Sequence, residues 1–170
     1  MKRPTTWIVS VDLSTGEVER TPVDDALNSA YLGGSGVGWR LMSDALAPGV
    51  DPLSPANIIC INPGVLVGTL TPGTPKTTVI TKFPTLASED GKHFIGACTA
   101  GGRYLGIALK RAGCHHLLIT GRAPRPSYLR IVDQTIELVD AAEYWGGGIE
   151  DVMTIVPASG PSGENLVHEA

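Results

Sequence analysis

Short apolar segments separated by turn residues make up most of the chain, and they predict strands more often than helices. Residues 76–82 alternate polar and apolar side chains, as a strand with one solvated face does. Residues 7–11 and 17–19 flank a turn at residues 14–16, which predicts a hairpin. The other segments that predict strands are residues 57–61, 93–98, 116–120, 128–132 and 136–139, with the last two forming a tight hairpin.

Three stretches have the residue spacing of short helices. Asp24 or Asp25 can cap the first helix, which runs through Tyr31. Gly113 follows the last helix and is a favourable C-cap. Residues 47–56 contain three prolines and predict a surface loop. The other two predicted helices cover about residues 39–46 and 104–112.

One outline occurs twice, in residues 11–34 and in residues 132–147: a hairpin, an acidic cap, a short helix, an aromatic residue and Gly-Gly. The two copies differ in length, so chance similarity is the alternative to a duplication. We therefore predict an α+β fold, a duplicated unit of mainly antiparallel β-sheets with short helices. At 170 residues the chain fits a single domain, residues 1–170, or at most two small lobes.

The composition and the net charge argue against several classes of binding partner. Hydrophobic residues make up 42% and charged residues 18%, as in an ordinary globular protein. The net charge is −4 and no run of Lys or Arg interrupts it, so we expect no nucleic-acid partner. No stretch approaches the roughly 20 apolar residues that cross a bilayer. The start of the chain lacks a secretory signal, so we expect no membrane partner and a cytoplasmic location.

The three cysteines do not form a recognisable metal site. Cys60, Cys98 and Cys114 are widely spaced, and the chain has neither a CxxC pair nor a Cys/His cluster. A zinc site or a self-contained iron–sulfur site is therefore not predicted. We expect buried apolar thiols in a reducing cytoplasm.

The glycine-rich segment 33–38 invites comparison with a dinucleotide-binding loop. The G-x-G-x-x-G fingerprint starting at Gly34 would need glycine at Trp39, and a helix rather than a strand precedes it. Two interpretations stay open. The segment is a flexible joint between two helices, or its backbone packs close against a cofactor, as only glycine permits.

A second glycine pair offers a sharper candidate. The predicted strand ending at Ala100 runs into Gly101-Gly102, and the following helix places Arg103 in its first turn. Free N–H groups and the positive end of the helix dipole suit such a junction to phosphate, and Arg103 could add a bidentate contact. Lys76 could supply a second cation. A plain tight turn and an ordinary surface lysine are the alternatives.

No catalytic constellation stands out in the sequence. His115 and His116 are neighbours in a predicted strand, so their side chains point to opposite faces and cannot share one metal ion. The serines lack a G-x-S-x-G nucleophile elbow. The chain therefore predicts a binding surface without catalytic residues of its own.

Seven segments in register make the chain resemble the N-terminal domain of the tungsten-dependent aldehyde ferredoxin oxidoreductase family. Each would be weak evidence alone, but together they run over nearly the whole chain in the order that the family has. The segments are VDLSTG at 11–16, YLGG at 31–34, PGVDPLSP at 48–55, TKFP at 81–84, residues 101–113, YWG at 144–146 and GPSGENLV at 160–167.

The resemblance implies a base of β-sheets on which a tungsten ion held by two pterins rests. In the family, a basic residue at the position of Lys76 and the Gly-Gly loop approach the pterin phosphates, which a magnesium ion bridges. An asparagine that helps to hold magnesium falls at Thr99 or Ala100 in this sequence. The implied cofactor-binding residues are Lys76, Thr99, Ala100, Gly101, Gly102 and Arg103, with Thr99 as the candidate magnesium ligand.

The sequence also departs from the family pattern. Lys76 stands where the family often has arginine, which keeps the charge but loses the planar fork. Ser35 replaces a frequent arginine, and the stretch between Gly148 and Gly160 is shorter than usual. The cluster cysteines, a second cofactor loop and the groups near the metal come later in the family. We therefore expect the 4Fe-4S cluster on domains that this chain lacks, or on a partner chain.

The resemblance implies part of a tungsten- or molybdenum-pterin oxidoreductase that converts aldehydes to carboxylic acids with ferredoxin-type electron acceptors. Without the later domains, turnover by this chain alone is not expected. The expected partner is a larger cysteine-rich catalytic chain, or a second copy through the face that later domains normally cover. The alternatives are a stand-alone pterin-binding or interaction domain, a truncated gene product and a generic nucleotide-binding module.

Overall fold

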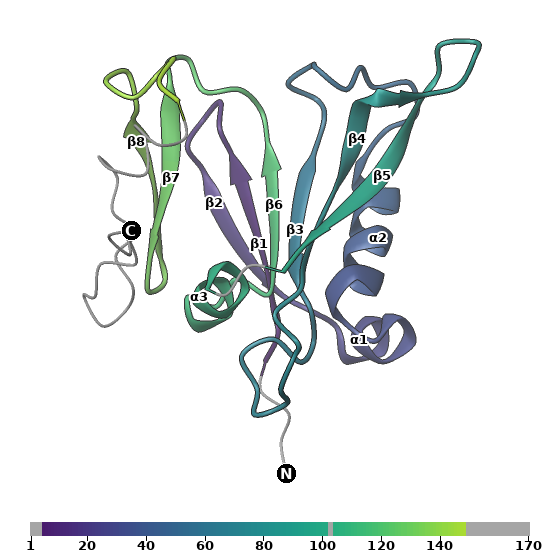
Figure 1. Ribbon diagram of the computed structural model, residues 1–170, viewed down its shortest axis with the longest axis vertical. Coiled ribbons are helices and arrows are strands. Elements are labelled where there is room, and N and C mark those ends of the chain that lie inside the picture. The colour runs from purple at the N-terminus through teal and green to yellow at the C-terminus, as the bar shows by residue number, and fades with distance from the viewer. Residues whose placement is uncertain (1–4, 102–103, 149–170) are drawn as a thin grey trace.

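The fold is built around one large sheet, shown in Figure 1. The computed structural model describes residues 5–101 and 104–148. Six strands form this sheet in the order β2-β1-β6-β3-β4-β5, and β7 and β8 pair as a separate two-stranded sheet. The strands are β1 (Trp7–Asp12), β2 (Val18–Pro22), β3 (Ile59–Pro63), β4 (Thr77–Ala87), β5 (His93–Ala100), β6 (His116–Thr120), β7 (Ser127–Val132) and β8 (Thr135–Asp140); the helices are α1 (Asp25–Tyr31), α2 (Gly34–Ala45) and α3 (Leu105–Arg111).

The sheet is mixed but mainly antiparallel. Only the β1–β6 pair among the strands described is parallel; β1–β2, β3–β6, β3–β4 and β4–β5 are antiparallel. Each predicted strand forms, and β4 continues to Ala87, beyond the predicted end at Lys82. The α+β class with mainly antiparallel pairing is confirmed.

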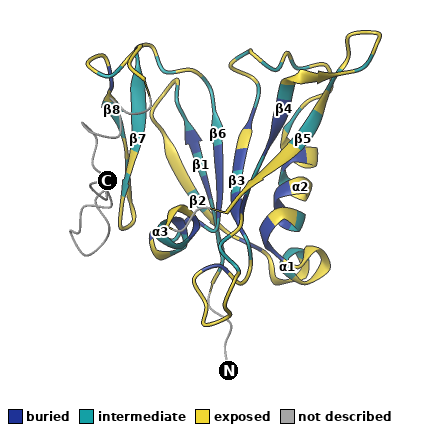
Figure 2. Cartoon of the chain, viewed as in Figure 1, coloured by how far each residue is buried: buried dark blue, intermediate teal, exposed yellow. Residues whose placement is uncertain are grey.

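Two hydrophobic clusters cover opposite faces of the sheet. Leu117 and Leu118 are adjacent in β6, so they point to opposite sides. Leu118 packs with Met42 of α2, whereas Leu117 packs with Leu109 of α3 and with side chains of the β7–β8 hairpin. Figure 2 shows the buried residues concentrated in β1, β6, β3 and α2, with exposed residues on the edge strands β2 and β5. The helix α2 and the α3–hairpin layer therefore enclose the middle of the sheet and leave parts of β4 and β5 uncovered.

The glycine-rich segment forms a helix and is not a flexible joint. The prediction that the second helix starts near Trp39 is wrong, because α2 begins at Gly34. A Cβ atom at Gly38 would lie 2.4 Å from the Nδ2 atom of Asn62 in β3. The glycines thus let the first turns of α2 approach the sheet closely, which explains their presence without a cofactor.

The suspected duplication is visible in the two hairpins but not in the segments after them. The Asp24 carboxylate accepts a hydrogen bond from the Ala26 backbone at 3.0 Å, and the Asp140 carboxylate accepts one from the Ala142 backbone at 2.8 Å. The first of these caps α1, whereas residues 142–146 form turns. The expectation of a helix in the second copy is therefore wrong for the described residues.

The structure also bears on the expectations for the cysteines and for a membrane-spanning helix. Cys60 and Cys114 are buried as expected, but Cys98 is exposed on the edge strand β5, so the expectation of three buried thiols is wrong for that residue. Within residues 5–101 and 104–148, no helix is long and apolar enough to cross a bilayer.

Candidate functional site

Four of the predicted site residues meet at one end of the β4–β5 pair. The register places Thr77 opposite Ala100 and Thr78 opposite Thr99. Lys76 directly precedes β4, and Gly101 directly follows β5. We call Lys76, Thr99, Ala100 and Gly101 the Lys76 cluster, and all four residues are exposed. Gly102 and Arg103 lie outside the described residues, so their predicted role stays a prediction.

A folded loop holds Lys76 at this position. The N–H of Gly64, which follows β3, donates to the carbonyl of Lys76 at 3.0 Å and closes the chain between the two strands. Inside the loop, the hydroxyls of Thr69 and Thr74 both donate to the carbonyl of Leu66, at 2.7 and 3.0 Å. Threonine side chains that bond nearby backbone are typical of such loops. The backbone of Lys76 is thus fixed at the entrance to β4.

The helix α3 fastens the same loop from the other side. The Nζ atom of Lys110 donates to the carbonyls of Val65 at 2.7 Å and Val67 at 3.0 Å. Burial lowers the pKa of Lys110. At Gly106, a Cβ atom would lie 2.5 Å from the Oγ1 atom of Thr77 and 3.0 Å from Val67. The absent side chain therefore lets α3 dock directly on the strand end beside the Lys76 cluster.

The helix itself starts later than predicted. Tyr104 is the N-cap of α3 and makes no capping hydrogen bond through its side chain, and the helix has seven residues. The helix thus starts at Leu105, one residue after its predicted start, and the predicted place of Arg103 falls outside the described residues. A helix of two turns, beginning four residues after Gly101, gives little dipole support to an anion at the Lys76 cluster. The case for phosphate then depends on the lysine and the glycine backbone.

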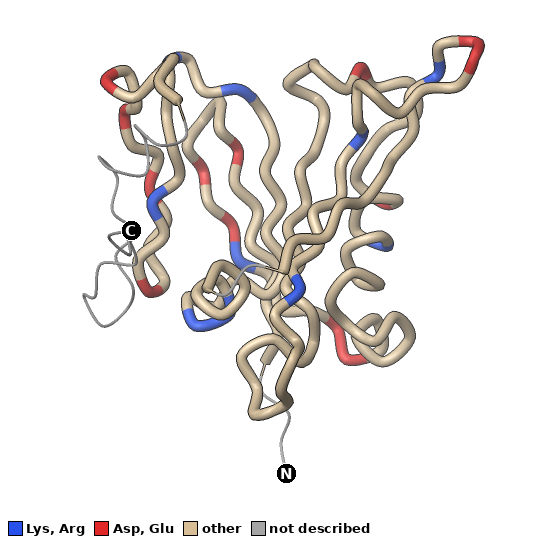
Figure 3. Tube along the Cα trace, viewed as in Figure 1, with Lys and Arg blue, Asp and Glu red and all other residues tan. Residues whose placement is uncertain are grey.

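Charge is spread widely over the molecule. Figure 3 shows Lys and Arg distributed over the described trace rather than gathered into one basic patch. No three His, Cys, Asp or Glu side chains in the described part of the chain come close enough to hold a metal ion. The Lys76 cluster can therefore supply a cationic donor, a hydroxyl and open backbone, but not a metal centre made of side chains.

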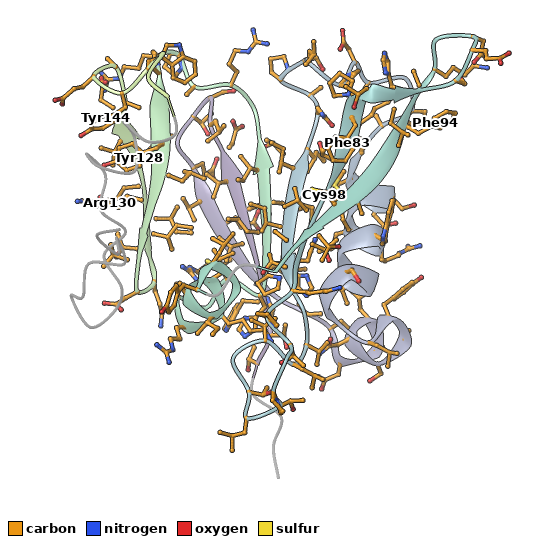
Figure 4. The ribbon with its side chains drawn as sticks, viewed as in Figure 1. Phe83, Phe94, Cys98, Tyr128, Arg130 and Tyr144 are labelled. Carbon is orange, nitrogen blue, oxygen red and sulfur yellow. The ribbon has the colours of Figure 1, made fainter. Side chains whose placement is uncertain are left out.

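An exposed apolar surface extends from the Lys76 cluster along the sheet. The register aligns Ile59, Thr81 and Gly96 across β3, β4 and β5. Phe83 packs over Gly96, where a Cβ would lie 3.0 Å from its ring, and Ile59 remains 42% exposed. In Figure 4, Phe83, Phe94 and Cys98 lie on the β4–β5 side of the molecule, opposite Tyr128, Arg130 and Tyr144 on the hairpin side. We define Ile59, Phe83, Leu86 and Cys98 as the uncovered sheet face.

Sequence reasoning missed this surface. Residues 58–61 are continuously apolar, which predicts a strand buried on both faces. The structure buries Ile58 and Cys60 under α2 but leaves Ile59 open. The apolar run at residues 58–61 was the one signal in the sequence for this surface. It requires an apolar cover on both faces of β3, and the structure covers only the face towards α2.

Comparison with known proteins identifies the family. The sequence profile of the aldehyde ferredoxin oxidoreductase N-terminal domain matches residues 8–170. The chain belongs to the aldehyde ferredoxin oxidoreductase family. The predicted resemblance is thereby confirmed, including over the segment 160–167, which lies outside the described residues.

Relatives of this aldehyde ferredoxin oxidoreductase domain are much longer chains. The tungsten-containing aldehyde ferredoxin oxidoreductase of Pyrococcus furiosus is 34% identical over 170 aligned residues, which cover 94% of this chain and 27% of that protein. The enzyme of the same name from Thermococcus kodakarensis is 34% identical over 92% of this chain and 27% of its own. The chain thus spans about a quarter of the length of these relatives.

Two other relatives have different names. The WOR-like subunit of an aliphatic sulfonate oxidoreductase from Pyrococcus furiosus is 32% identical over 88% of this chain and 23% of its own. A solved structure titled as the active site complex BamBC of benzoyl coenzyme A reductase with 1,5-dienoyl-CoA matches with a TM-score of 0.78 and 30% identity. That match covers 88% of this chain and 22% of the other. The family domain is therefore shared among oxidoreductases with different names.

Proposed function

We propose that this chain supplies the cofactor-binding base of a tungsten- or molybdenum-pterin oxidoreductase that converts aldehydes to carboxylic acids. The observation that carries the proposal is the Lys76 cluster, in which an exposed lysine stands beside an exposed strand end. Family membership supports the oxidoreductase class, and the tungsten-containing relatives support the cofactor.

The cluster fits the phosphate of a pterin cofactor in two respects. Lys76 lies at a fixed point of the backbone and is exposed, so its ammonium can reach an anion. A Cβ atom at Gly101 would meet nothing within 4 Å, so the backbone there is open to a ligand. Lys76 and the N–H groups after Thr99 would hold the phosphate, and Arg103 would add a second cation.

Magnesium fits less well. Mg²⁺ is usually held by one or two carboxylates together with phosphates and water. The Lys76 cluster offers the neutral hydroxyl of Thr99 and backbone carbonyls, and no acidic cluster is found in the described residues. We therefore assign no step to a magnesium ion held by this chain alone, and Thr99 as its ligand stays a prediction.

The residues present suggest which part of the reaction the cofactor would carry out and which part this chain would support. A bound tungstopterin would supply the redox chemistry. This chain would fix the position of the pterin phosphates through the Lys76 cluster and exclude water beneath the cofactor with the uncovered sheet face. No residue of the described chain is assigned a catalytic role, so the acid–base groups and the 4Fe-4S cluster belong to further domains or to a partner chain.

The substrate is set outside this domain. The relatives are named for an aldehyde, an aliphatic sulfonate and a benzoyl-CoA reductase, although all of them match the same domain. An aldehyde substrate and a ferredoxin-type electron acceptor rest on the aldehyde ferredoxin oxidoreductases among them. We place the protein in the cytoplasm, where its free cysteines stay reduced.

A second function is favoured by the uncovered sheet face. Ile59 and Leu86 are 42% and 45% exposed on this face. Apolar patches of this kind mark interaction sites in soluble proteins. The alternative is therefore a stand-alone pterin-binding or interaction domain that covers this face with a second copy or with a larger cysteine-rich chain.

Purification from the native source separates the two functions. Tungsten or molybdenum by elemental analysis, pterin fluorescence after oxidation and a co-purifying cysteine-rich chain would support the oxidoreductase. Lys76→Met should lower the pterin content, and Lys92→Met, at an exposed lysine in the β4–β5 hairpin, should not. A metal-free protein that carries no pterin and recovers no larger partner would contradict the proposal; if it also self-associated, the interaction domain would be favoured.

A further inference from the structure

A cavity of about 620 Å³ lies between α1, the loop after β3 and the start of β6. Figure 1 shows these segments at one end of the large sheet. The volume is within the range of small-molecule sites. None of the four residues of the Lys76 cluster lines this cavity, so it is distinct from the proposed phosphate site. Residues that line it include Asn28, Gly33, Val65, Val67, Lys110 and His116.

His116 brings a buried polar side chain to the cavity wall. Only 1% of its surface is exposed. The Nδ2 atom of Asn62 donates to the carbonyl of Cys60 at 3.1 Å, so the Oδ1 atom of Asn62 faces the Nδ1 atom of His116 at 2.8 Å. Nδ1 therefore carries the proton, and Nε2 presents a bare lone pair. Burial, and then the charges of His115 and Lys110, lower the pKa of His116 to about 4, so the ring is neutral at pH 7.

The Nε2 atom of His116 has no partner among the described residues. The bond to Asn62 is the one side-chain hydrogen bond that His116 makes with them. In the same part of the chain, only the Oγ1 atom of Thr77 and the Nδ1 atom of His93 are sealed from solvent without a hydrogen bond. The Nε2 atom is therefore in contact with the cavity. Because buried polar groups are nearly always paired, this acceptor calls for a donor from a ligand.

Lys110 offers the complementary group. Its ammonium has three N–H donors, and two of them reach the carbonyls of Val65 at 2.7 Å and Val67 at 3.0 Å. Within the described residues, the third N–H has no acceptor, and Lys110 lines the cavity. The other imidazole in the wall is engaged, because the Nδ1 atom of His115 accepts the N–H of Trp7 at 3.2 Å. The cavity thus presents one free acceptor and one free donor.

The surroundings of His116 favour an uncharged ligand. A carboxylate has no hydrogen to donate to a bare imidazole nitrogen. An ammonium would meet the same burial and the same Lys110 charge that disfavour the protonated form of His116. The ligand therefore donates to Nε2 from a neutral group and accepts from Lys110 through a different atom.

We propose that this cavity binds a small uncharged cyclic amide, whose N–H donates to the Nε2 atom of His116 and whose carbonyl accepts from the Lys110 ammonium. An amide holds its donor and its acceptor on neighbouring atoms, whereas an alcohol must use one oxygen for both. Pro63, Val65 and Val67 provide apolar walls for the ring. The proposal does not depend on the pterin function.

Titration of the full chain with uracil and 1,3-dimethyluracil, followed by NMR, tests the site. The methylated compound keeps the ring and both carbonyls but has no N–H donor. Uracil should bind at one site and shift the ¹⁵N signal of the His116 Nε2 atom. The methylated compound should bind at least about tenfold more weakly, because the hydrogen bond to Nε2 is lost. Benzoate, a charged ring of similar size, should also bind more weakly than uracil.

Two pairs of variants locate the contacts. His116→Leu should weaken uracil binding at least about tenfold, and Val9→Ala, a buried change in the neighbouring strand β1 that does not line the cavity, should leave it within about twofold. Lys110→Met should also weaken binding about tenfold, because a charged donor is lost. Thr74→Val removes a hydrogen bond to Leu66 from the same loop but keeps Lys110, so it should have little effect.

Each other outcome overturns the proposal. Absence of saturable uracil binding removes the site, and equal binding of 1,3-dimethyluracil removes the contact with His116. Tighter binding of benzoate removes the uncharged class. Equal losses in Lys110→Met and Thr74→Val would assign the effect to the loop and remove Lys110 from the site. If His116→Leu does not fold, the ¹⁵N signal of Nε2 in the wild-type chain decides the question, and an unchanged signal contradicts the proposal.

Discussion

The Nδ1 atom of His116 in β6 lies 2.8 Å from the Oδ1 atom of Asn62 in β3, and both side chains are fully buried. The Nδ2 atom of Asn62 donates to the carbonyl of Cys60 at 3.1 Å, which fixes the orientation of the amide. The Oδ1 atom is therefore the acceptor, and His116 donates through Nδ1–H. The sheet interior thus contains a polar pair whose members depend on each other.

Asn62→Ala should lower the free energy of unfolding by about 2–3 kcal/mol. The change leaves the buried Nδ1–H of His116 without an acceptor and opens a small void under α2. Urea unfolding followed by circular dichroism measures the loss. Ser43→Ala, an exposed change in the same helix layer, should stay within about 0.5 kcal/mol of the wild type. Equal stability of Asn62→Ala and wild type would show that the pair does not matter.

Stability should fall on mild acidification because of His116. Burial first, and then the charges of His115 and Lys110, lower the pKa of His116 from 6.5 to about 4. Between these values the unfolded chain binds the proton and the folded chain does not, so stability present above pH 6.5 is lost as the pH falls towards 4. The full loss is about 3 kcal/mol.

The variant His116→Gln isolates this contribution. It cannot take up the proton, so its free energy of unfolding should vary less with pH between 6.5 and 4 than that of the wild type. Urea titrations at several pH values measure the two slopes. An identical pH dependence in both proteins would assign the acid sensitivity to other groups, such as His115, whose pKa burial also lowers.

The sequence patterns predicted the positions of the strands and helices better than the tertiary contacts between them. Local signals placed β1, β6 and α1 almost residue by residue, because alternation and an Asp24 cap act within a few positions. They could not show that the glycines belong to α2, since Gly38 packs against a strand side chain, Asn62, that lies more than 20 residues further along the chain. In the sequence alone, several glycines in a row favour a flexible segment between helices. When a helix packs closely against a sheet, the same glycines are compatible with helix because they leave room for the strand side chains.

Gly38→Ala tests this explanation of the glycine-rich helix. A Cβ atom at position 38 would lie between 2.4 and 2.6 Å from three atoms of the Asn62 amide, so α2 or the amide must move. We expect a net loss of about 1–3 kcal/mol, although alanine is the better helix former. The double variant with Asn62→Ala should lose less than the sum of the two single changes, because the clash partner is then gone. Strict additivity would refute the contact.

The candidate site was predicted in part. Family landmarks placed Lys76 and Thr99 in one site, and the β4–β5 register brings them together. The helix after the junction begins at Leu105, within one residue of its predicted start, and the role of the Gly101-Gly102 junction stays a prediction. Lys82 gave no signal in the sequence, since a lysine at the end of an alternating strand is normally solvated. Its low exposure of 9% depends on contacts that are distant in the sequence, which local patterns do not place.

Thr77 and Gly106 give a prediction about the docking of α3. The Oγ1 atom of Thr77 is buried without a hydrogen bond among the described residues, so Thr77→Val should be neutral or should stabilise the fold by about 1 kcal/mol. Gly106→Ala should destabilise it by about 1–3 kcal/mol, because the added methyl overlaps that hydroxyl. Thermal unfolding of both variants measures these effects. A large loss in Thr77→Val would indicate a partner for the hydroxyl.

Lys110 should control the mobility of the loop that holds Lys76. Its ammonium donates to the carbonyls of Val65 and Val67, and the same loop is closed by the Gly64–Lys76 hydrogen bond. Lys110→Met keeps the stem of the side chain but removes both donors, so the loop should open more often. We expect only about 1 kcal/mol of global destabilisation, because water can replace part of the bonding.

Hydrogen exchange distinguishes loop opening from general instability. The N–H groups of Val67 and Thr69, which donate to Gly64 and Leu66, should exchange several-fold faster in Lys110→Met. The N–H groups of β1 and β6 in the sheet centre should change only by the global loss. Arg111→Met, an exposed change on the neighbouring residue, should leave the loop at the wild-type rate. Uniform acceleration of all amides would show that Lys110 supports the whole fold, and Lys76 would then owe its position to the strands alone.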